Sequence, residues 1–551
     1  MMNQTQPATA GLSEPWRAGH LVALASVLLV GLGLGWQERL PDVEIGGDEA
    51  TYVALSHSLE QGHYRDEFLA GTPPHAKYPP GNAAWLLLVR TIAGPDLDFV
   101  RFANLLLLAI TALLTGDAVR RLASPWAGVG AVAVTILNPG LLRVSGSVLS
   151  ETPYIALVTL SAWACLRGDR AASRRWEMVG YAAALTAFLT RSIGLTALGA
   201  ITLTYLVRRR WRAGALAGIG TVIAGGGWGA YIGWASQRTN GDTYGGELTT
   251  HLGRMWFLTP QFGANTLEKS YWYLKDLPTN FVLPTIEGTP VDNLAWYLIL
   301  FGCGGVGLWV LVRRWPVLVL TLTGSFLVLA AWLWGVERLI LPLLPGGVAM
   351  LMIGAHTVGH RRGPQAALLA VSVLALLLWT SALAFHRSQL INRPGCDRRD
   401  PYGLSSCFGA PATRLVAAAR LARQALPADA IVATSKPATV FHFSGRRAFP
   451  LGALVSGIER DSARSLASFG FTHIILGEVL NKDWRIVGPL LYRRCRSLRV
   501  VAEVPPATVL LSLGGADTSE EGACRYFESR LRDQEISGDR RPDLRKVEIR
   551  P

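Results

Sequence analysis

Long apolar runs dominate this chain and limit the folds open to it. About eleven runs, most of them roughly 16 to 22 residues long, have the length at which a helix crosses the bilayer core. Only 17% of the residues are charged, whereas a typical soluble protein has about 25%. We therefore expect a mainly α-helical, polytopic membrane protein. The predicted spans are 19–37, 98–118, 125–142, 152–167, 177–190, 193–207, 213–235, 294–312, 315–334, 339–358 and 365–386.

Arginines between the apolar runs predict how the spans are oriented. One set of loops carries arginines in short clusters, whereas the short loops of the other set carry one each, namely Arg143, Arg191 and Arg338. Cytoplasmic loops hold the excess of basic residues, so the first loop, 37–97, is expected to face outward from the inner (plasma) membrane. The net charge of +14 comes from these clusters and does not indicate nucleic-acid binding. The clustered arginines are Arg120, Arg121, Arg167, Arg170, Arg174, Arg175, Arg208, Arg209, Arg210, Arg212, Arg313, Arg314, Arg361 and Arg362.

The stretches outside the spans predict the domain organisation. Residues 1–18 are polar and expected to be a disordered cytoplasmic N-terminus, and 19–386 form the membrane domain. Residues 387–530 are soluble in composition and predict a small extracytoplasmic α/β domain, followed by a charged, disordered tail at 531–551. Within that domain we expect a helix at 413–425 and strands at 430–433, 473–476, 500–504 and 508–513.

Two short helices are expected in the first outward loop, at 49–61 and 81–92, either lying in the membrane interface or shallowly re-entrant. On the first, Tyr52, Leu55 and Leu59 line one face, and Glu49, Ser56 and Glu60 the other. A later outward loop, 236–293, is rich in glycine, threonine and aromatic residues and is also expected to contain interfacial helices.

The six cysteines fall into two groups. Cys165 and Cys303 lie within predicted spans and are expected to be buried as small apolar residues. Cys396, Cys407, Cys495 and Cys524 lie in the outward domain, where an oxidising compartment permits one or two disulfides with three alternative pairings. A Cys396–Cys407 disulfide is one prediction.

Two adjacent carboxylates follow the first span, in Gly46-Gly47-Asp48-Glu49. In the transfer of a group from a phosphate, a carboxylate takes the proton of the acceptor and cations stabilise the departing phosphate. If a helix begins at Glu49, Asp48 lies above the apolar stripe and Glu49 is rotated by about 100°, which favours Asp48 as the base. The alternative is that Asp48 only caps the helix.

Candidate cations lie at the other outward loops. Lys77 precedes the rigid segment Tyr78-Pro79-Pro80, which presents the lysine in an extended backbone. Arg191 and the pair Glu337-Arg338 lie at predicted outer ends of spans, where arginine suits bidentate contact with phosphate. The alternative for these groups is anchoring in lipid headgroups.

An acidic residue, Glu151, follows the third span, where a carboxylate is costly unless it faces a polar cavity or a partner. The alternative is a helix N-terminal residue that complements the helix dipole. His57, His63 and His75 share the first outward loop, but their spacing matches no compact metal motif, and we expect them to be solvated. No cofactor is therefore assigned, and a divalent metal stays an open alternative.

Together these residues resemble the GT-C glycosyltransferases of the protein-mannosyltransferase and aminoarabinose-transferase type. The resemblance covers 21–387 in layout. It rests on four motifs, which are Gly47-Asp48-Glu49-Ala50-x-Tyr52, Lys77-Tyr78-Pro79-Pro80-Gly81, Ser150-Glu151-Thr152-Pro153-Tyr154 and Glu337-Arg338-Leu339-Ile340-Leu341-Pro342.

The resemblance implies an inverting enzyme that takes a sugar from a polyprenyl-phosphate carrier at the outer membrane face and gives it to a glycan, lipid or protein acceptor. It implies that Asp48 is the catalytic acidic position and Glu151 the second acidic position, although some relatives have aspartate in place of Glu151. Glu49, next to Asp48, is also expected to be catalytic. It implies donor-phosphate contacts for Lys77 and Arg338, with Arg191 a looser match. The remaining residues expected to bind substrate are Tyr52, Tyr78 and Glu337.

Two other functions compete with this interpretation. An O-antigen-type ligase or polymerase would place its main outward loop late in the chain, whereas the acidic pair here comes early. A lipid-linked sugar transporter or flippase would carry ionisable residues at mid-span and show paired halves. Here the ionisable residues lie at one membrane face, and the sequence shows no repeat.

Overall fold

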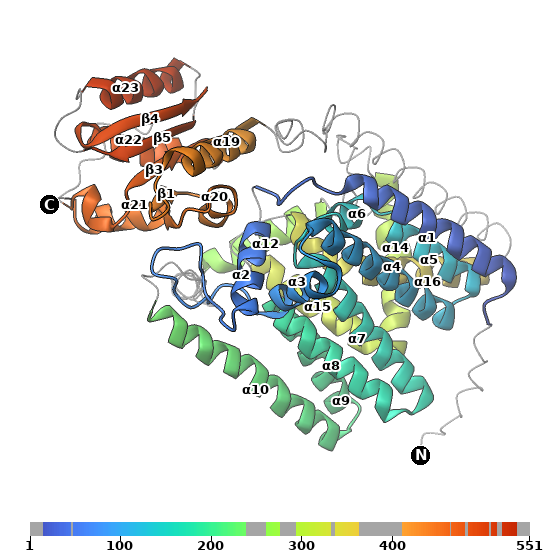
Figure 1. Ribbon diagram of the computed structural model, residues 1–551. Helices are drawn as coiled ribbons and strands as arrows, with labels where there is room; N and C mark the ends of the chain where they lie inside the picture. The colour runs from blue at the N-terminus through green and yellow to red at the C-terminus, as the bar shows by residue number, and fades with distance from the viewer. Residues whose placement is uncertain are drawn as a thin grey trace. The chain divides into compact units, whose positions relative to one another are not determined.

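A computed structural model describes residues 15–45, 48–238, 260–275, 294–331, 337–362, 410–462, 464–479, 483–505, 508–514 and 521–536. The chain divides into two compact units (Figure 1). The helical unit comprises Met1–Arg39, Tyr78–Gly229 and His251–Ile391. The sheet unit comprises Leu40–Lys77, Ala230–Thr250 and Asn392–Pro551. The first loop, 37–97, is therefore divided between the two units, whereas the sequence placed it wholly in the membrane domain.

Helices coincide with ten of the eleven predicted spans, and the eleventh, 365–386, lies outside the described residues. The two short helices expected in the first loop are also confirmed, as α2 (Glu49–Glu60) and α3 (Gly81–Ala93). The other helices that begin in the helical unit are α1 (Ala18–Glu38), α4 (Leu97–Leu122), α5 (Pro125–Ile136), α6 (Pro139–Ser145), α7 (Glu151–Ala171), α8 (Arg174–Thr190), α9 (Leu195–Val207), α10 (Trp211–Ser236), α12 (Pro260–Lys275), α14 (Leu294–Arg314), α15 (Pro316–Ala331) and α16 (Leu344–Arg362), with the 3-10 turns η1 (Ser192–Gly194) and η2 (Glu337–Leu343).

The predicted span 125–142 is not one straight helix. Helices α5 and α6 meet at a bend of 57°, because Pro139 cannot donate the backbone hydrogen bond that would continue α5. Asn138 begins the second helix, where its side-chain oxygen accepts a hydrogen bond from the Leu141 amide at 3.1 Å. The sequence expectation of a continuous helix is therefore wrong at this point.

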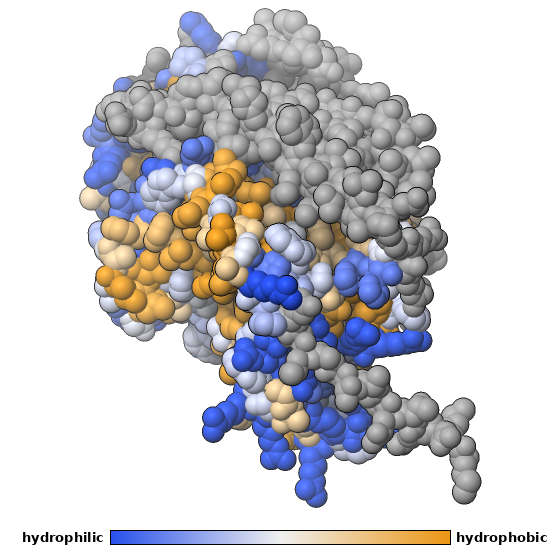
Figure 2. Space-filling model, turned by 90° about the vertical axis from the view of Figure 1, so that its right-hand side faces the viewer, coloured by the Kyte–Doolittle hydropathy of each residue, from blue (hydrophilic) through white to orange (hydrophobic). Residues whose placement is uncertain are grey.

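Apolar side chains on the outside of the helical unit fit a lipid environment. Leu29, Val222 and Ile223 are about two-thirds exposed or more, and Figure 2 shows hydrophobic residues gathered over one side of the molecule. Soluble monomers rarely expose large contiguous apolar areas. Among the described helices, four are long and apolar enough to cross a membrane, or five if the bent α5–α6 pair forms one span.

The arginine clusters meet at one end of the helical unit. Asp117 near the end of α4 pairs with Arg120 and Arg121 and accepts a hydrogen bond from Trp163 of α7. Arg170 at the end of α7 donates to the backbone carbonyl of Arg121 at 2.7 Å. Two further pairs, Arg208–Asp169 and Arg210–Glu177, join the α9–α10 connection to the end of α7 and the start of α8. These arginines therefore lie together at one end of the helical unit, and the membrane side that this end faces stays a prediction.

A five-stranded sheet forms the centre of the sheet unit, in the order β2-β1-β3-β5-β4. Strand β1 is parallel to β2 and β3, whereas β5 is antiparallel to β3 and β4. The four predicted strands are confirmed, and β2 was missed. The strands are β1 (Val432–Thr434), β2 (Ala448–Pro450), β3 (His473–Leu476), β4 (Leu498–Val504) and β5 (Thr508–Leu513).

Helices cover both faces of this sheet. Alternate residues of β3 and β5, including Ile474 and Leu511, pack into a core with α21 (Leu451–Arg460), α22 (Gly488–Tyr492) and α23 (Glu521–Ile536). Helix α19 (Ala410–Ala425) packs on β3, β4 and β5, and α20 (Pro437–Ser444) packs on β1 and β2. The remaining turns are η3 (Leu466–Phe469), η4 (Asp483–Val487) and η5 (Cys495–Ser497). Helix α23 ends at Ile536, beyond the predicted start of the tail at 531.

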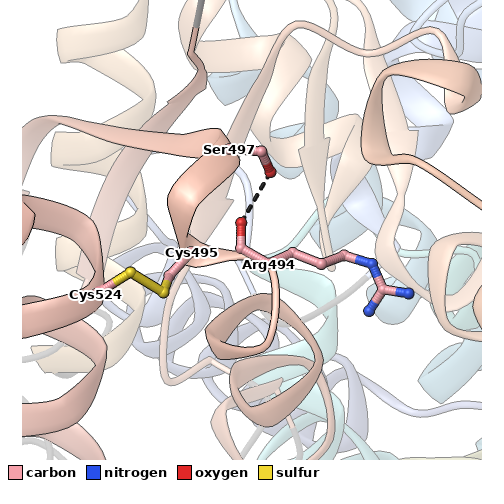
Figure 3. The surroundings of a disulfide bond; sticks show 4 residues. All are labelled: Arg494, Cys495, Ser497 and Cys524. Atoms are coloured by element: carbon pink, nitrogen blue, oxygen red, sulfur yellow. Dashed lines mark hydrogen bonds between the residues drawn. A yellow bond between two sulfur atoms is a disulfide. The ribbon is translucent and has the colours of Figure 1, made fainter. Parts of the chain in front are cut away.

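A disulfide joins Cys495 to Cys524 and ties α23 to the turn before β4 (Figure 3). The predicted Cys396–Cys407 disulfide lies outside the described residues. Cys165 is a buried free thiol, as expected, and Cys303 is a half-buried one.

Candidate functional site

Three predicted residues meet at the end of the helical unit opposite to the arginine clusters. Glu151 is the first residue of α7 and is 1% exposed. Arg191 ends α8 and places Nη1 2.7 Å from Glu151 Oε1. Arg338, in η2, places Nε 3.7 Å from the same oxygen. Arg191 and Arg338 follow Glu151 by 40 and 187 residues in the sequence, and both pair with its carboxylate.

Burial makes the pairing of Glu151 a structural requirement. A carboxylate removed from water costs several kcal/mol unless cations and hydrogen bonds compensate it. Within the described part of the chain, neither oxygen of Glu151 accepts a hydrogen bond of good geometry. In the described part of the chain, Arg191 and Arg338 therefore compensate the buried negative charge of Glu151. Arg191 is also held by the hydrogen bond that it donates to Ser150 Oγ at 2.9 Å.

Each of the two arginine side chains is fixed by Glu151 and is also partly exposed. The Arg191 side chain is 20% exposed and the Arg338 side chain is 29% exposed. Their orientation is set from inside the protein by Glu151, while part of each guanidinium reaches the surface. Two held guanidinium groups of this kind can bind a phosphate.

Local packing brings the Tyr78–Gly81 segment to the same end of the helical unit. Gly81 begins α3, and a Cβ at this position would lie 2.6 Å from the carbonyl oxygen of Leu189. Only glycine permits this close approach to the end of α8, immediately before Arg191. Tyr78 is half-buried. Lys77, which precedes it and is the last residue of the first loop assigned to the sheet unit, is exposed.

In the sheet unit, Asp48 takes the N-cap position of α2, but its side chain accepts no hydrogen bond from the first turn. The capping contact that was the alternative role is therefore not made. Asp48 is half-buried. It belongs to a different unit from Glu151, so a shared site for these two carboxylates stays a prediction.

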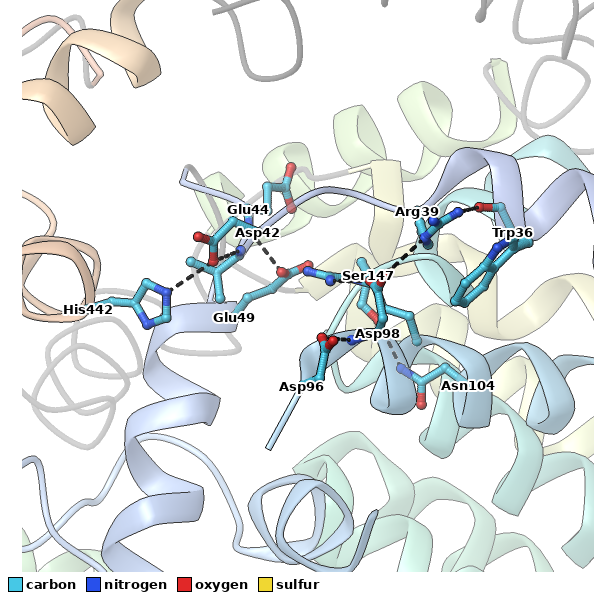
Figure 4. A network of polar contacts seen from close by, with 12 residues as sticks. Trp36, Arg39, Asp42, Glu44, Glu49, Asp96, Asp98, Asn104, Ser147 and His442 are labelled. Carbon is cyan, nitrogen blue, oxygen red and sulfur yellow. Dashed lines mark hydrogen bonds and ion pairs between the residues drawn. The ribbon is translucent and has the colours of Figure 1, made fainter. Parts of the chain in front are cut away.

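Glu49 is fully buried, and its Oε2 accepts a hydrogen bond from the Glu44 amide at 2.8 Å (Figure 4). Ser56 is buried as well, and Tyr52 is 3% exposed. Glu49 and Ser56 lie on the face predicted to be the polar one, and they are buried nevertheless, in a helix that packs against α20. Glu49 fixes the backbone just before Asp48, and its catalytic role stays a prediction.

The C-terminal part of the chain holds the first loop at several points. His442 Nε2 lies 3.0 Å from Asp42 Oδ1, and Thr439 Oγ1 donates to the Ile45 carbonyl at 3.4 Å. Further along the loop, Leu69 pairs with Ala448 in parallel fashion. The loop thereby extends the sheet beyond its edge strand β2.

The three histidines of the first loop differ in environment. His57 and His63 are exposed, as expected for solvated side chains. His75 is 2% exposed and its Nδ1 lies 2.6 Å from Asp66 Oδ1, so this histidine is structural rather than solvated. Burial raises the pKa of the neighbouring Tyr64, which keeps its hydroxyl neutral. The described residues contain no group of three or more potential metal ligands.

The predicted residue Glu337 is the first residue of η2, and its side chain lies outside the described part of the structure.

Sequence reasoning missed a polar cluster between α3, α4 and the α6–α7 connection. Arg101 is 1% exposed and donates from Nη1 to Asp98 at 2.8 Å. Asn104 accepts a hydrogen bond from Trp85 and donates one to the Ser147 carbonyl. The spacing of Asp98 and Arg101, one helical turn apart at the start of a span, was the available signal.

No protein-family model matches the chain, and no curated protein sequence matches it. Several solved structures do have a fold similar to that of this chain. ArnT from Cupriavidus metallidurans in the apo state has 13% identity and a TM-score of 0.55, covering 90% of this chain and 98% of that one. The same protein bound to undecaprenyl phosphate has 16% identity and a TM-score of 0.53, with 92% and 100% covered.

A third structure is the archaeal oligosaccharyltransferase AglB from Archaeoglobus fulgidus, in complex with an inhibitory peptide and a dolichol-phosphate. It has 12% identity and a TM-score of 0.51, covering 91% of this chain and 75% of AglB. ArnT and AglB are both GT-C superfamily glycosyltransferases. Over about nine-tenths of its length, the chain therefore shares the fold of these two proteins, as the resemblance of its motifs implied.

Proposed function

We propose that the protein is an inverting glycosyltransferase that moves a sugar from a polyprenyl-phosphate carrier to an acceptor at the outer face of the cytoplasmic membrane. The observation that carries the proposal is the convergence of Glu151, Arg191 and Arg338 from three distant segments. This cluster occurs in a fold shared with ArnT, which has been solved with undecaprenyl phosphate bound.

The two arginines are assigned to the donor phosphate, with Lys77 as a third cation. Glu151 acts as a positioning residue, because it is buried and touches both guanidinium groups. Cations held in place before the reaction stabilise developing charge without the cost of reorganising water. Gly81 supports this arrangement, since its close contact with Leu189 fixes the segment that follows Lys77.

Asp48 is assigned as the base. The acceptor oxygen forms a bond to the anomeric carbon as the bond from that carbon to the phosphate oxygen breaks. The acceptor proton passes to the Asp48 carboxylate, and the polyprenyl phosphate departs with the bonding electrons. Attack from the face opposite to the phosphate inverts the anomeric centre, and the cations stabilise the leaving group.

The donor class follows from the predicted orientation. Nucleotide sugars are charged and cytosolic, so an outward-facing site takes its sugar from a carrier anchored in the membrane. The carrier's prenyl chain would lie among the apolar helices while its phosphate reaches the arginines at their ends. Acceptors of the glycan, lipid and protein classes all present a nucleophilic group to such a site.

The test compares Asp48→Asn with Glu60→Gln, which removes an exposed carboxylate from the same helix. A deletion strain is complemented with each variant, and lipid-linked sugars and envelope glycans are measured by mass spectrometry. Asp48→Asn is expected to abolish the transferred product and to leave the protein inserted in the membrane at the normal level. Glu60→Gln is expected to restore the product. Full transfer by Asp48→Asn would remove Asp48 as the base.

A further inference from the structure

The sheet unit contains a large hollow, lined by residues that the proposed donor site does not include. It has a volume of about 1150 Å³, above the range of roughly 300–1,000 Å³ typical of sites for small ligands. One wall is the turn of the first loop, including Asp66 and Gly71. The other wall comes from α21 and the segment through η3, including Gly452, Arg464 and Phe469. We propose that this hollow binds a saccharide portion of the acceptor.

Both walls are held in place before any ligand arrives. In the first loop, Arg65 pairs with Pro74 and the buried His75 binds Asp66. The Ala70 amide donates to Ala448 at 3.1 Å, and the Ala448 amide donates to Phe68 at 2.7 Å. These bonds join the two walls through the backbone. A rigid site loses less entropy when it orders a flexible glycan.

The lining favours a saccharide. Arg464 lies over the Phe469 ring, with its Cζ 4.1 Å from the ring centroid, and its Nε donates to Ser468 Oγ at 3.1 Å. The Phe469 ring thus holds the guanidinium in place, and a fixed guanidinium can bind the hydroxyl groups of a sugar or an acidic substituent. Ser456, Ser465 and Asp461 add further polar groups to the lining.

The same observations disfavour the other acceptor classes at this hollow. An extended peptide would add a strand to an open sheet edge, but Leu69 already pairs with Ala448 at the edge of β2. A lipid chain requires a continuously apolar groove, whereas arginine, aspartate and serine residues line this one. The inference rests on the proposed function, since it names the class of acceptor that the enzyme receives.

The direct test is saccharide binding to the full-length protein in lipid nanodiscs, measured by saturation-transfer NMR with chitotriose, mannotriose and trigalacturonate. Gly452→Trp fills the hollow, because a Cβ at Gly452 meets no atom within 4 Å. Glu459→Trp places the same side chain at an exposed position of the same helix outside the lining. At least one trisaccharide is expected to bind the unmodified protein and Glu459→Trp equally, with a signal at least five-fold lower in Gly452→Trp.

A second measurement follows the role of Arg464. Arg464→Ala is expected to reduce the saccharide signal, and Arg464→Lys to restore part of it. No signal from any of the three trisaccharides, or equal signals in Gly452→Trp and Glu459→Trp, would overturn the proposal. Binding of undecaprenyl phosphate is measured on the same samples and is expected to be unchanged in Gly452→Trp. Its absence from the unmodified protein would count against the proposed function rather than against the saccharide site.

Discussion

At the scale of single residues, Glu151 organises the cations of the proposed donor site. It is the buried partner in both ion pairs, whereas Arg191 and Arg338 each keep part of their side chain exposed. Glutamine preserves the size of the side chain and removes the charge that orients the two guanidinium groups. A displacement of about 1 Å in a reacting group costs roughly 10²-fold in rate.

Glu151→Gln is therefore expected to lower transfer by about 10²-fold or more, measured as product formed by purified protein at saturating donor. Glu151→Asp, which retains the charge, is expected to recover part of the lost rate. A purely structural role would predict that both variants lose activity only in proportion to the loss of folded protein. Thermal unfolding of each variant separates the two cases.

Arg338 offers a test of phosphate binding itself. Loss of one charge-assisted hydrogen bond removes about 1.5–3 kcal/mol, so Arg338→Ala is expected to weaken undecaprenyl phosphate binding by roughly 10- to 100-fold. Arg143→Ala is the control, since Arg143 is an exposed arginine at a predicted outer loop. Native mass spectrometry of the detergent-solubilised protein measures both affinities. Equal affinities in the two variants would remove Arg338 from the phosphate site.

At the scale of elements, the contact between α3 and α8 depends on Gly81, because a glycine has no side chain to separate the two helices. A Cβ on Gly81 would lie 2.6 to 2.8 Å from backbone atoms of Leu189 and Thr190, which cannot move aside without shifting α8. Overpacking of this kind costs about 1–3 kcal/mol. Gly81→Ala is expected to lower the unfolding temperature and to reduce transfer, because α3 carries the segment that follows Lys77.

The matched control is Gly199→Ala in α9, where a Cβ meets no atom within 4 Å. Alanine has a higher helix propensity than glycine, so this variant is expected to be as stable as the unmodified protein or slightly more stable. Thermal unfolding in detergent and transfer assays on both variants provide the comparison. A Gly81→Ala protein of normal stability and activity would contradict a tight α3–α8 contact.

Long apolar runs in the sequence made most of the helices predictable. The helices α1, α4 and α7 fall close to their predicted spans because their apolar runs are long. The bend after Ile136 was missed although Asn138-Pro139 is a recognisable helix start. Strand β2 was missed because Ala448–Pro450 has only three residues and ends in proline, which gives no alternating pattern.

Pairing between distant segments was harder to predict. Glu151, Arg191 and Arg338 all lie at predicted outer ends of spans, which places them at one depth, but the sequence did not predict that both arginines pair with Glu151. Burial of Glu49 was not expected, because helix α20, which packs against α2, lies nearly 400 residues later in the chain. Local periodicity contains no information about such a partner.

At the scale of the whole molecule, the sheet unit joins the C-terminal part of the chain to the loop that carries Asp48. His442 binds Asp42, and the Ala448 amide donates to Phe68. These contacts lie on both sides of Asp48 along the sequence. The C-terminal part therefore holds the proposed base in position although the residues involved are some 400 positions away.

Ala448→Pro is expected to reduce transfer strongly, because proline removes the amide that donates to Phe68 and cannot pair at this position. His442→Ala is expected to act in the same direction through the loss of the Asp42 contact. Glu503→Ala, on the opposite edge strand β4, is the control and is expected to retain normal transfer. Hydrogen exchange of residues 40–77 is expected to rise in the first two variants and to stay unchanged in the third. Full transfer by Ala448→Pro, despite faster exchange in the loop, would show that the C-terminal part of the chain does not position Asp48.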